Sequence, residues 1–556
     1  MKISQLVVFS FLKIWLTACG ATAVLVSISA HAQTDTVIVR GKVDNLTLRL
    51  YRQAPEITVA RVNILQPERE IVRAATLQPN GQFELKMPLI YPLEECYLNY
   101  ANVSLPFLAA KGTVEITLFA DSLGKTEVPL RFGGLYAATN NRHARFYTAY
   151  NQWLKANPEK STKAENSYRF WEKISLEQEQ RIGFYRSFSS AKDPVLDKWV
   201  ISSLEEATNA RFYHYLIQQK EVIPTGLIGA ADLDTTLFLT FAKADCYRQF
   251  SAHAVATTPA PAESTLPINK LATLILKYVP NLPEEDIVKL QSFAQGEKAK
   301  MSDLKWLNNL YLKKQDTLNL ISTYELYVKK FGASYMGKEL EYLKPQFYLV
   351  NLNNYPGEKM TQWYRYIRSD LQNPYYIRSL DEIHRRESAD SALIQAAQSQ
   401  IEGTDVTTPA EIKGGLLLAQ NTLLTTARTV WEQIKKKYQG KNIYLIFWTN
   451  DDIGRAALEE ARALRERLPE NKIAFVYLCE HKTTDELWIQ SVVKSKAKGL
   501  HLKLNEIQND DFVIEWEINS VPHCVLLDPN GKYIQRKAPL PADQVGWDKV
   551  WNKLFR

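Results

Sequence analysis

Cysteine is the residue in this 556-residue chain with the widest range of possible chemistry, and it occurs five times. The cysteines are Cys19, Cys96, Cys246, Cys479 and Cys524. They are widely spaced, and no two of them form a C-x-x-C pair. The sequence therefore predicts neither a four-cysteine zinc site nor a small scaffold held together by disulfides.

Other residue types that carry catalysis show no motif either. The histidines beyond the N-terminal segment are His143, His214, His253, His384, His481, His501 and His523. None of them forms an H-x-x-x-H or H-x-H pair, and the chain lacks the phosphate-loop and nucleophile-elbow patterns. We expect no metal and no cofactor.

The charge of the chain is modest for its length. Formal net charge is +7, and Lys2 and Lys13 in the first segment contribute two of these charges. The one dense basic block, Lys435-Lys436-Lys437, fits a solvated helix face. Hydrophobic residues make up 46%, which is typical of a globular protein, and nucleic acid is not an expected partner.

The first 32 residues are predicted to be a signal peptide. Lys2 and Lys13 flank apolar runs, and the small residues Ala30 and Ala32 fit cleavage after Ala32. An alternative is a lipoprotein box, LTAC, whose Cys19 would carry a lipid anchor. Both routes export the chain, which predicts the periplasm or, in the alternative, an outer-membrane lipoprotein. No later segment reaches the ~18 to 20 apolar residues of a transmembrane span.

Two regions of different character follow this segment. Residues 33–135 contain short runs rich in β-branched residues, such as TVIVRGKV and TVEITLFAD, which predict an antiparallel β-sandwich-like domain. Residues 136–401 change to helical periodicity, as at Phe212, Tyr215 and Leu216. These aromatic stripes indicate core packing, with a ligand groove as the alternative. A loop at 257–267 divides the helical region.

The last part, residues 413–556 after a linker at 402–412, alternates strands and helices. Near-continuous apolar runs NIYLIFW and IAFVYLC predict two buried parallel strands, each followed by a helix. VPHCVLLD and KYIQRKAP then predict a hairpin, and GWDKVWNKLF a closing helix. The fold class is therefore multi-domain α+β, with a C-terminal α/β domain.

Three stretches of this last part carry a family resemblance: YQGKNIYLIFWTN, Leu487-Trp488 and INSVPHCVLLDPNGKYIQRKAPLP. They resemble the thioredoxin fold, specifically the TlpA-like thiol-disulfide proteins of Gram-negative envelopes. The resemblance implies a cis peptide between Val521 and Pro522, facing the active site. An export signal, a β-domain and a helical middle region are also the layout of that family's larger members.

The same resemblance implies a redox site that this chain lacks. The family's W-x-x-x-C-x-x-C motif uses one thiolate to attack a disulfide and a second to resolve the intermediate. Counting from Trp448, these positions hold Asp452 and Arg455. A carboxylate cannot replace a thiolate in this reaction, so no catalytic residue is expected at the degenerate redox positions.

Two interpretations of the altered corner remain open. Asn450, Asp451 and Asp452 precede a predicted helix and are good N-terminal caps. The alternative is a rebuilt polar pocket that binds a ligand. Its binding candidates are Trp448, Asp452, Arg455, Val521, Pro522 and His523.

The expected strand order bears on the two C-terminal cysteines. It places Cys479 and Cys524 on either side of strand NIYLIFW, ~9.5 Å apart at ~4.8 Å per strand. A disulfide requires Cα atoms closer than ~7 Å, so this pair should stay unbridged. Both are interpreted as small buried hydrophobes, with Cys524 as a possible reactive thiol in the alternative.

These observations favour an exported, non-catalytic binding or scaffolding protein of the cell envelope, whose partner is another envelope protein or a peptide. One alternative is a thiol-disulfide oxidoreductase of the TlpA-like family acting through a single cysteine. Another is a helical peptide-binding module within residues 136–401.

Overall fold

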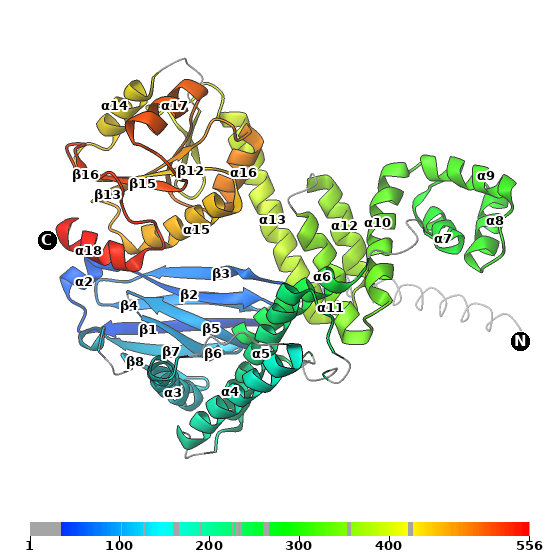
Figure 1. Cartoon of the computed structure of the whole chain (residues 1–556), viewed down its shortest axis with the longest axis horizontal. Coiled ribbons are helices and arrows are strands. Elements are labelled where there is room, and N and C mark those ends of the chain that lie inside the picture. The colour runs from blue at the N-terminus through cyan, green and yellow to red at the C-terminus, as the bar shows by residue number, and fades with distance from the viewer. Residues whose placement is uncertain are drawn as a thin grey trace, which may run out of the picture.

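The computed structural model describes residues 35–554, apart from 102, 126–127, 159–165, 189–191, 225–226, 228–232, 234–235, 260–265, 353–356 and 421–425. The signal peptide predicted at 1–32, including Cys19, lies outside this range. In the described part, a β-sandwich, a helical region and a mixed α/β part surround one long helix (Figure 1).

The first part is a sandwich of two sheets. Its strands are β1 (Asp35–Asp44), β2 (Glu56–Asn63), β3 (Gln66–Thr76), β4 (Gln82–Leu89), β5 (Leu93–Tyr100), β6 (Val103–Ala109), β7 (Gly112–Phe119) and β8 (Leu130–Gly134), with short helices α2 (Leu48–Gln53) and η1 (Ala120–Ser122). One sheet has the order β4-β1-β7-β8 and the other contains β3-β2-β5-β6. Alternate side chains, such as Val37 and Val39 of β1 and Val59 of β2, fill the space between the sheets.

The expectation of a purely antiparallel sandwich is wrong in two places. Strand β1 runs parallel to β7, from Val37 beside Gly112 to Asp44 beside Phe119. This is possible because the chain passes through the other sheet between them, and parallel neighbours need such a long crossover. In addition, β9 (Phe238–Leu239), from the region predicted to be helical, pairs in parallel with β5.

The helical region packs directly against one end of the sandwich. Its helices are α3 (Ala137–Ala156), α4 (Ser167–Phe188), α5 (Pro194–Gln219), α6 (Phe241–Thr257), α7 (Ile268–Tyr278), α8 (Glu284–Ala294), α9 (Met301–Leu312), α10 (Gln315–Gly332), α11 (Gly337–Asn351), α12 (Gly357–Asp370) and α13 (Pro374–Gln400). Phe212 and Leu216 are fully buried and Tyr215 stacks on Phe170 at 4.1 Å, which confirms the stripe as core packing. The same core includes sandwich residues such as Tyr91.

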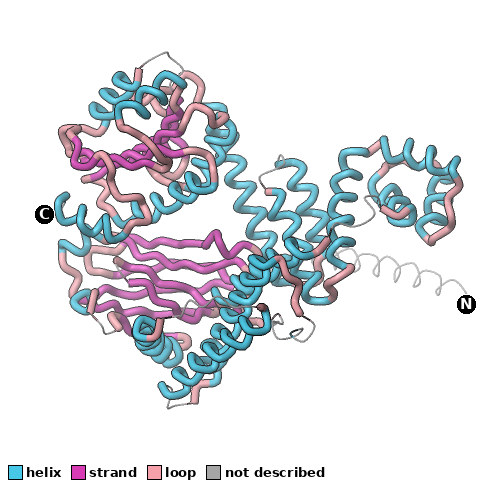
Figure 2. The backbone as a smooth tube through the Cα atoms, viewed as in Figure 1, coloured by secondary structure: helices cyan, strands magenta, loops and turns pink. Residues whose placement is uncertain are grey.

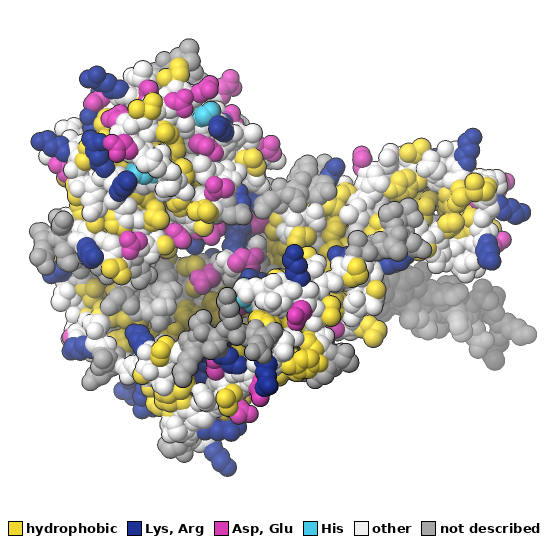
Figure 3. All heavy atoms as spheres, in the orientation of Figure 1, with side chains coloured by type: hydrophobic (Ala, Val, Ile, Leu, Met, Phe, Trp, Pro, Cys, Tyr) yellow, Lys and Arg dark blue, Asp and Glu magenta, His cyan; other side chains and the backbone are white. Residues whose placement is uncertain are grey.

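Helices α7, α8 and α9 form an arm that projects from the rest of the helical region (Figures 1 and 2). The arm has a core of its own, which includes Leu274, Leu290 and Leu310 and continues onto α10 through Leu318. It follows the predicted loop at 257–267, since α6 ends at Thr257 and α7 begins at Ile268. Some hydrophobic side chains nevertheless reach the surface of the arm (Figure 3).

The last part is built on a seven-stranded sheet of order β10-β11-β14-β13-β12-β15-β16. Its elements are β10 (Ala410–Ile412), β11 (Leu416–Gln420), α14 (Ala427–Lys437), β12 (Asn442–Trp448), α15 (Asp452–Arg467), β13 (Ile473–Cys479), α16 (Asp485–Ser495), β14 (Gly499–Lys503), α17 (Glu506–Glu515), β15 (His523–Leu527), β16 (Tyr533–Gln535) and α18 (Gln544–Leu554). Strands β12 and β13 are parallel and buried at every residue, whereas β15 runs antiparallel to β12. This arrangement is a thioredoxin-like fold.

The sequence prediction of this sheet is correct at its centre and incomplete at its edge. The parallel pair β12–β13, the final hairpin and the closing helix are confirmed. Strand β14 and helix α17 are additional, and the linker predicted at 402–412 contains β10, which forms a hairpin with β11. These strands of three to five residues are too short to show a period.

Helix α13 connects all three parts. Near its N-terminal end, Tyr376 and Leu380 belong to the core of the helical region, whereas Ala397 and Ile401 at its other end belong to the thioredoxin-like core. A helix of 27 residues spans about 40 Å at 1.5 Å per residue, which is long enough to reach both cores.

Charged side chains form ion pairs between α13 and its neighbours in a partly buried interface. Arg69 of β3 donates to Glu387 and, at 2.6 Å, to Asp390 of α13. From the other side, Lys494 and Lys496 at the end of α16 lie 3.6 and 3.7 Å from these two carboxylates. Each carboxylate is therefore shared between the sandwich and the thioredoxin-like part.

A second, more deeply buried set lies along β2. Arg61, fully buried, donates to Glu382 of α13 and, at 2.6 Å, to the carbonyl of Pro88. Its Nε also lies 3.7 Å from Glu94 of β5. Asn63 donates to the same Glu382 at 3.0 Å. Burial of these groups is tolerated because each has partners on another element.

We expect Arg69→Ala to lower the free energy of unfolding by about 3 kcal/mol, because Glu387 and Asp390 would lose their strongest cation in a partly buried site. Urea unfolding followed by tryptophan fluorescence measures this loss. Arg73→Ala is the matched control, since Arg73 lies on the same strand but is exposed and donates to the adjacent carbonyl of Val72. If both variants were equally stable, the interface would depend on apolar packing alone.

Candidate functional site

The loop between β12 and α15 is the place where the family resemblance implies an active site. Strand β12 ends at Trp448, and α15 begins at Asp452 with Asp451 as its N-cap. The Asp451 carboxylate accepts from the backbone N–H of Gly454 at 2.7 Å and from the Thr449 hydroxyl at 2.8 Å. Both hydrogen bonds lower the pKa of the Asp451 carboxyl, and the one from Gly454 has the larger effect.

The structure therefore assigns the cap to Asp451, one of three neighbouring residues predicted for this role. Asn450 instead turns toward α16, where its side-chain oxygen accepts from the Ser491 hydroxyl at 2.6 Å. Asp452 is the first residue of the helix, and its side chain lies outside the described part.

Gly454 is required for the geometry of this loop, and the sequence analysis did not identify it. A Cβ at this residue would lie 1.9 Å from the carbonyl oxygen of Thr449, closer than any side chain tolerates. The loop and the first turn of α15 can approach each other only because residue 454 has no side chain. A glycine three residues after a capping Asp is the sequence feature that could have identified this position.

Arg455 and His523, two of the predicted binding residues, both bond to nearby backbone. Arg455 is exposed and donates to the carbonyl of Asn450 at 2.9 Å. His523 begins β15, pairs in register with Phe447, and its Nε2 lies 3.0 Å from the carbonyl oxygen of Arg536. Burial lowers the pKa of His523, which keeps the imidazole neutral at pH 7.

Two more of the predicted binding residues precede His523. The peptide between Val521 and Pro522 is cis, as the resemblance implies. Trp448, by contrast, is fully buried in the thioredoxin-like core, next in register to Cys479. The corner thus combines a capped helix start, an exposed Arg455 and Ile453, and a cis-proline that leads directly into β15.

No disulfide occurs among the cysteines that the structure describes: Cys96, Cys246, Cys479 and Cys524 are all free and buried. Cys479 pairs in register with Trp448 on one side of β12, and Cys524 with Ile446 on the other, which confirms the expected strand order. Burial raises the pKa of each of these two thiols to about 12. A thiol with such a pKa is almost entirely protonated at pH 7 and is a poor nucleophile.

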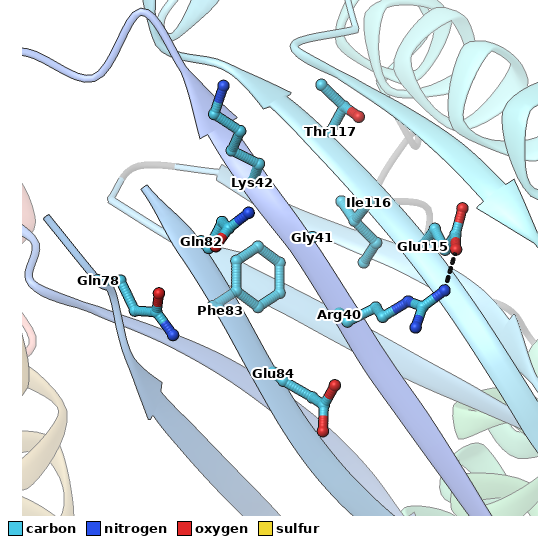
Figure 4. A pocket seen from close by; sticks show the side chains of 10 residues that line it. All are labelled: Arg40, Gly41, Lys42, Gln78, Gln82, Phe83, Glu84, Glu115, Ile116 and Thr117. Carbon is cyan, nitrogen blue, oxygen red and sulfur yellow. Dashed lines mark hydrogen bonds and ion pairs between the residues drawn. The ribbon is translucent and has the colours of Figure 1, made fainter. Parts of the chain in front are cut away.

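A hollow lies on the sandwich, over strands β4, β1 and β7 (Figure 4). Its volume is about 400 Å³, and it is lined by Arg40, Gly41, Lys42, Gln78, Gln82, Phe83, Glu84, Glu115, Ile116 and Thr117. Arg40 donates to Glu115 at 2.6 Å and is paired in register with Glu84. These charges neutralise one another on an exposed strand face, so the hollow has no group poised for chemistry.

Within the described ranges, no group of three or more His, Cys, Asp or Glu side chains is placed to hold a metal ion. The helices of that same part of the chain are all too short or too polar to cross a membrane.

Comparison with known proteins gives limited similarity. No family model matches the sequence, and a search of curated proteins finds no match. Among solved structures, a Bacteroides vulgatus protein assigned as a thiol-disulfide oxidoreductase is 28% identical, over 22% of this chain and 75% of its own, with a TM-score of 0.18. A thioredoxin-like protein from Bacteroides caccae is 12% identical over 53% of this chain and 98% of its own, also at 0.18.

A third solved structure, the thioredoxin domain of a thiol-disulfide oxidoreductase from Bacteroides vulgatus, is 17% identical over 21% of this chain and 83% of its own, with a TM-score of 0.20. Similarities of this size say nothing about activity. The thioredoxin-like fold of residues 410–554 follows from its own strand order, helix positions and cis-proline.

We expect Asp451→Ala to lower the free energy of unfolding by about 1 kcal/mol, because the Gly454 N–H loses its acceptor. Asp451→Asn is the matched control, since an amide oxygen can still cap the helix.

The pKa of Asp451 is lowered in the folded state, so its carboxylate stabilises the fold above the unfolded pKa of about 4 and stabilises it less as the pH falls. Urea unfolding at pH 7 and at pH 3 should therefore show that Asp451→Ala lowers the free energy of unfolding less at pH 3 than at pH 7. A pH-independent loss would contradict the role of the charge.

Proposed function

We propose that this chain is a thioredoxin-fold protein without redox activity, which serves as a binding or scaffolding protein of the cell envelope. The observation that carries the proposal is the corner itself. Where the family's chemistry needs two thiols, this chain has Asp452 and Arg455, and the loop before them is fixed by the Asp451 cap. What remains is a capped helix start with Arg455 and Ile453 exposed.

The geometry of the thiols supports the same proposal. Thiol-disulfide exchange requires an accessible thiolate. Cys524 is 2% exposed and Cys479 is not exposed at all, and both thiols have a pKa of about 12. The Cys524 thiol also shares a hydrogen bond with the buried Tyr444. These observations disfavour the alternative of an oxidoreductase that acts through a single cysteine.

A scaffolding role is further supported by the way the parts are joined. Helix α13 contributes to two cores, and its carboxylates bond to both the sandwich and α16. Such an arrangement favours a fixed orientation of the corner relative to the rest of the chain, as a platform for another envelope protein or a peptide requires.

Insulin-disulfide reduction by the purified chain tests the absence of redox activity. We expect no turnover from the wild type and none from Cys524→Ser. Asp452→Cys combined with Arg455→Cys should act as the positive control, since two thiols three residues apart at a helix start lie within disulfide reach. We expect this double variant to form the disulfide and to gain reductase activity.

Two outcomes would contradict these expectations. Wild-type turnover that Cys524→Ser abolishes would establish the single-cysteine oxidoreductase in place of a binding protein. A double variant that folds but keeps both thiols unpaired under oxidising conditions would show that residues 452 and 455 are not the family's redox positions.

We also propose export to the periplasm after cleavage following Ala32, because small residues at Ala30 and Ala32 end the apolar segment. The intact mass of the exported chain tests this proposal, and we expect a mature N-terminus at Gln33. A mass that corresponds to a chain beginning at Cys19 and carrying acyl groups would instead assign the protein to the lipoproteins.

A further inference from the structure

Helix α9 of the arm has two apolar faces, although only one of them is packed. Leu307 and Leu310 lie on the inner face, where they are buried in the core of the arm. On another, solvent-exposed face, Met301 and the residues three, four, seven and eleven positions after it form an outer stripe. Its members are Met301, Leu304, Lys305, Asn308 and Leu312. Three of these five positions are apolar, on a face that is usually mostly polar in a surface helix.

The apolar members of the outer stripe are open to solvent. Met301 is 83% exposed, Leu312 is 52% exposed and Leu304 is 41% exposed. Single exposed hydrophobic residues are normal on a protein surface. Three of them lie on one face of this 12-residue helix, with Lys305 and Asn308 between Leu304 and Leu312, and clustered exposed apolar residues are characteristic of interaction sites.

Five exposed lysines lie within α9 or within three residues of its ends. They are Lys298, Lys300, Lys305, Lys313 and Lys314. The acidic residue within α9, Asp303, is neutralised by Lys289 of α8 at 2.7 Å and also caps the start of α9. The five lysines outnumber the two exposed acidic residues next to them in the sequence, Glu297 and Asp316, so the charge near the stripe is net positive. Exposed acidic residues of the arm include Glu284 and Glu285, which begin the neighbouring helix α8.

The arm is placed so that a large surface can reach it. It projects beyond the sandwich and the thioredoxin-like part (Figure 1), and at its free end Lys and Arg side chains stand around hydrophobic ones (Figure 3). The stripe lies on the convex outside of a helix rather than in a groove, a shape that suits a broad flat partner better than an inserted peptide.

We propose that the outer stripe of α9 docks this protein onto an anionic lipid surface. Met301, Leu304 and Leu312 would enter the boundary between headgroups and acyl chains, while the lysines remain at the level of the phosphates. Each lysine near an anionic surface adds to the attraction, which weakens within about 10 Å at 0.1 M salt. This docking concerns the arm alone, so it stands whether or not the thioredoxin-like corner binds a partner.

Co-sedimentation of the purified chain without residues 1–32 tests the proposal, with phosphatidylglycerol-rich vesicles and with pure phosphatidylcholine vesicles. We expect binding to the anionic vesicles that added salt weakens. Replacing Met301, Leu304 and Leu312 together by Ser should weaken it at least about tenfold. Lys305→Glu combined with Lys313→Glu should weaken binding to the anionic vesicles as well, because it reverses two of the five charges.

The matched control replaces three exposed hydrophobic residues outside the arm by Ser, and should bind as the wild type does. They are Met336, Ile514 and Val545, which are 79%, 76% and 67% exposed. Three results would overturn the proposal: no vesicle binding, equal binding to both lipids, or binding that the two triple variants weaken equally. If the Met301, Leu304 and Leu312 variant instead converted a dimer into a monomer without any vesicle binding, the stripe would be a contact between copies and not a lipid site.

Discussion

The carboxylates of α13 are shared between cations of the sandwich and cations of the thioredoxin-like part, and the arrangement of the molecule depends on this sharing. Arg69 reaches Glu387 and Asp390 from one side, and the lysines at the end of α16 reach them from the other. Each of these ions alone would be costly to place in a partly buried interface. Together they bring three separate parts of the chain to one helix.

The thioredoxin-like corner has the backbone geometry of the fold, with Asp452 and Arg455 among its side chains. The strand, the turn, the helix start and the cis-proline at Pro522 are all present. The electrostatics of a helix N-terminus, which would stabilise a thiolate in a redox protein, here stabilise the carboxylate of Asp451. The dipole and the free N–H groups belong to the backbone, so they persist when the side chains change.

The arm and the corner lie in different parts of the molecule and make different surfaces. The corner is small, polar and fixed by hydrogen bonds to Asp451 and Asn450. The outer stripe of α9 exposes Met301, Leu304 and Leu312, with lysines within it and beyond its ends. Under the two proposals above, the corner binds a partner by polar contacts and the stripe docks onto a lipid surface, while α13 and the helical core separate the two sites.

The sequence by itself determined the features that depend on local pattern and on residue identity. Short runs rich in β-branched residues predicted the sandwich strands, continuous apolar runs predicted β12 and β13, and the absence of cysteine at positions 452 and 455 argued against redox chemistry. Only the tertiary structure decided the rest. Arg69 and Glu387 are 318 residues apart, and Gly454 is required by an approach to Thr449 that exists only after folding. β9 and β10 have two and three residues, so their pairing depends on neighbouring strands and not on any pattern within them.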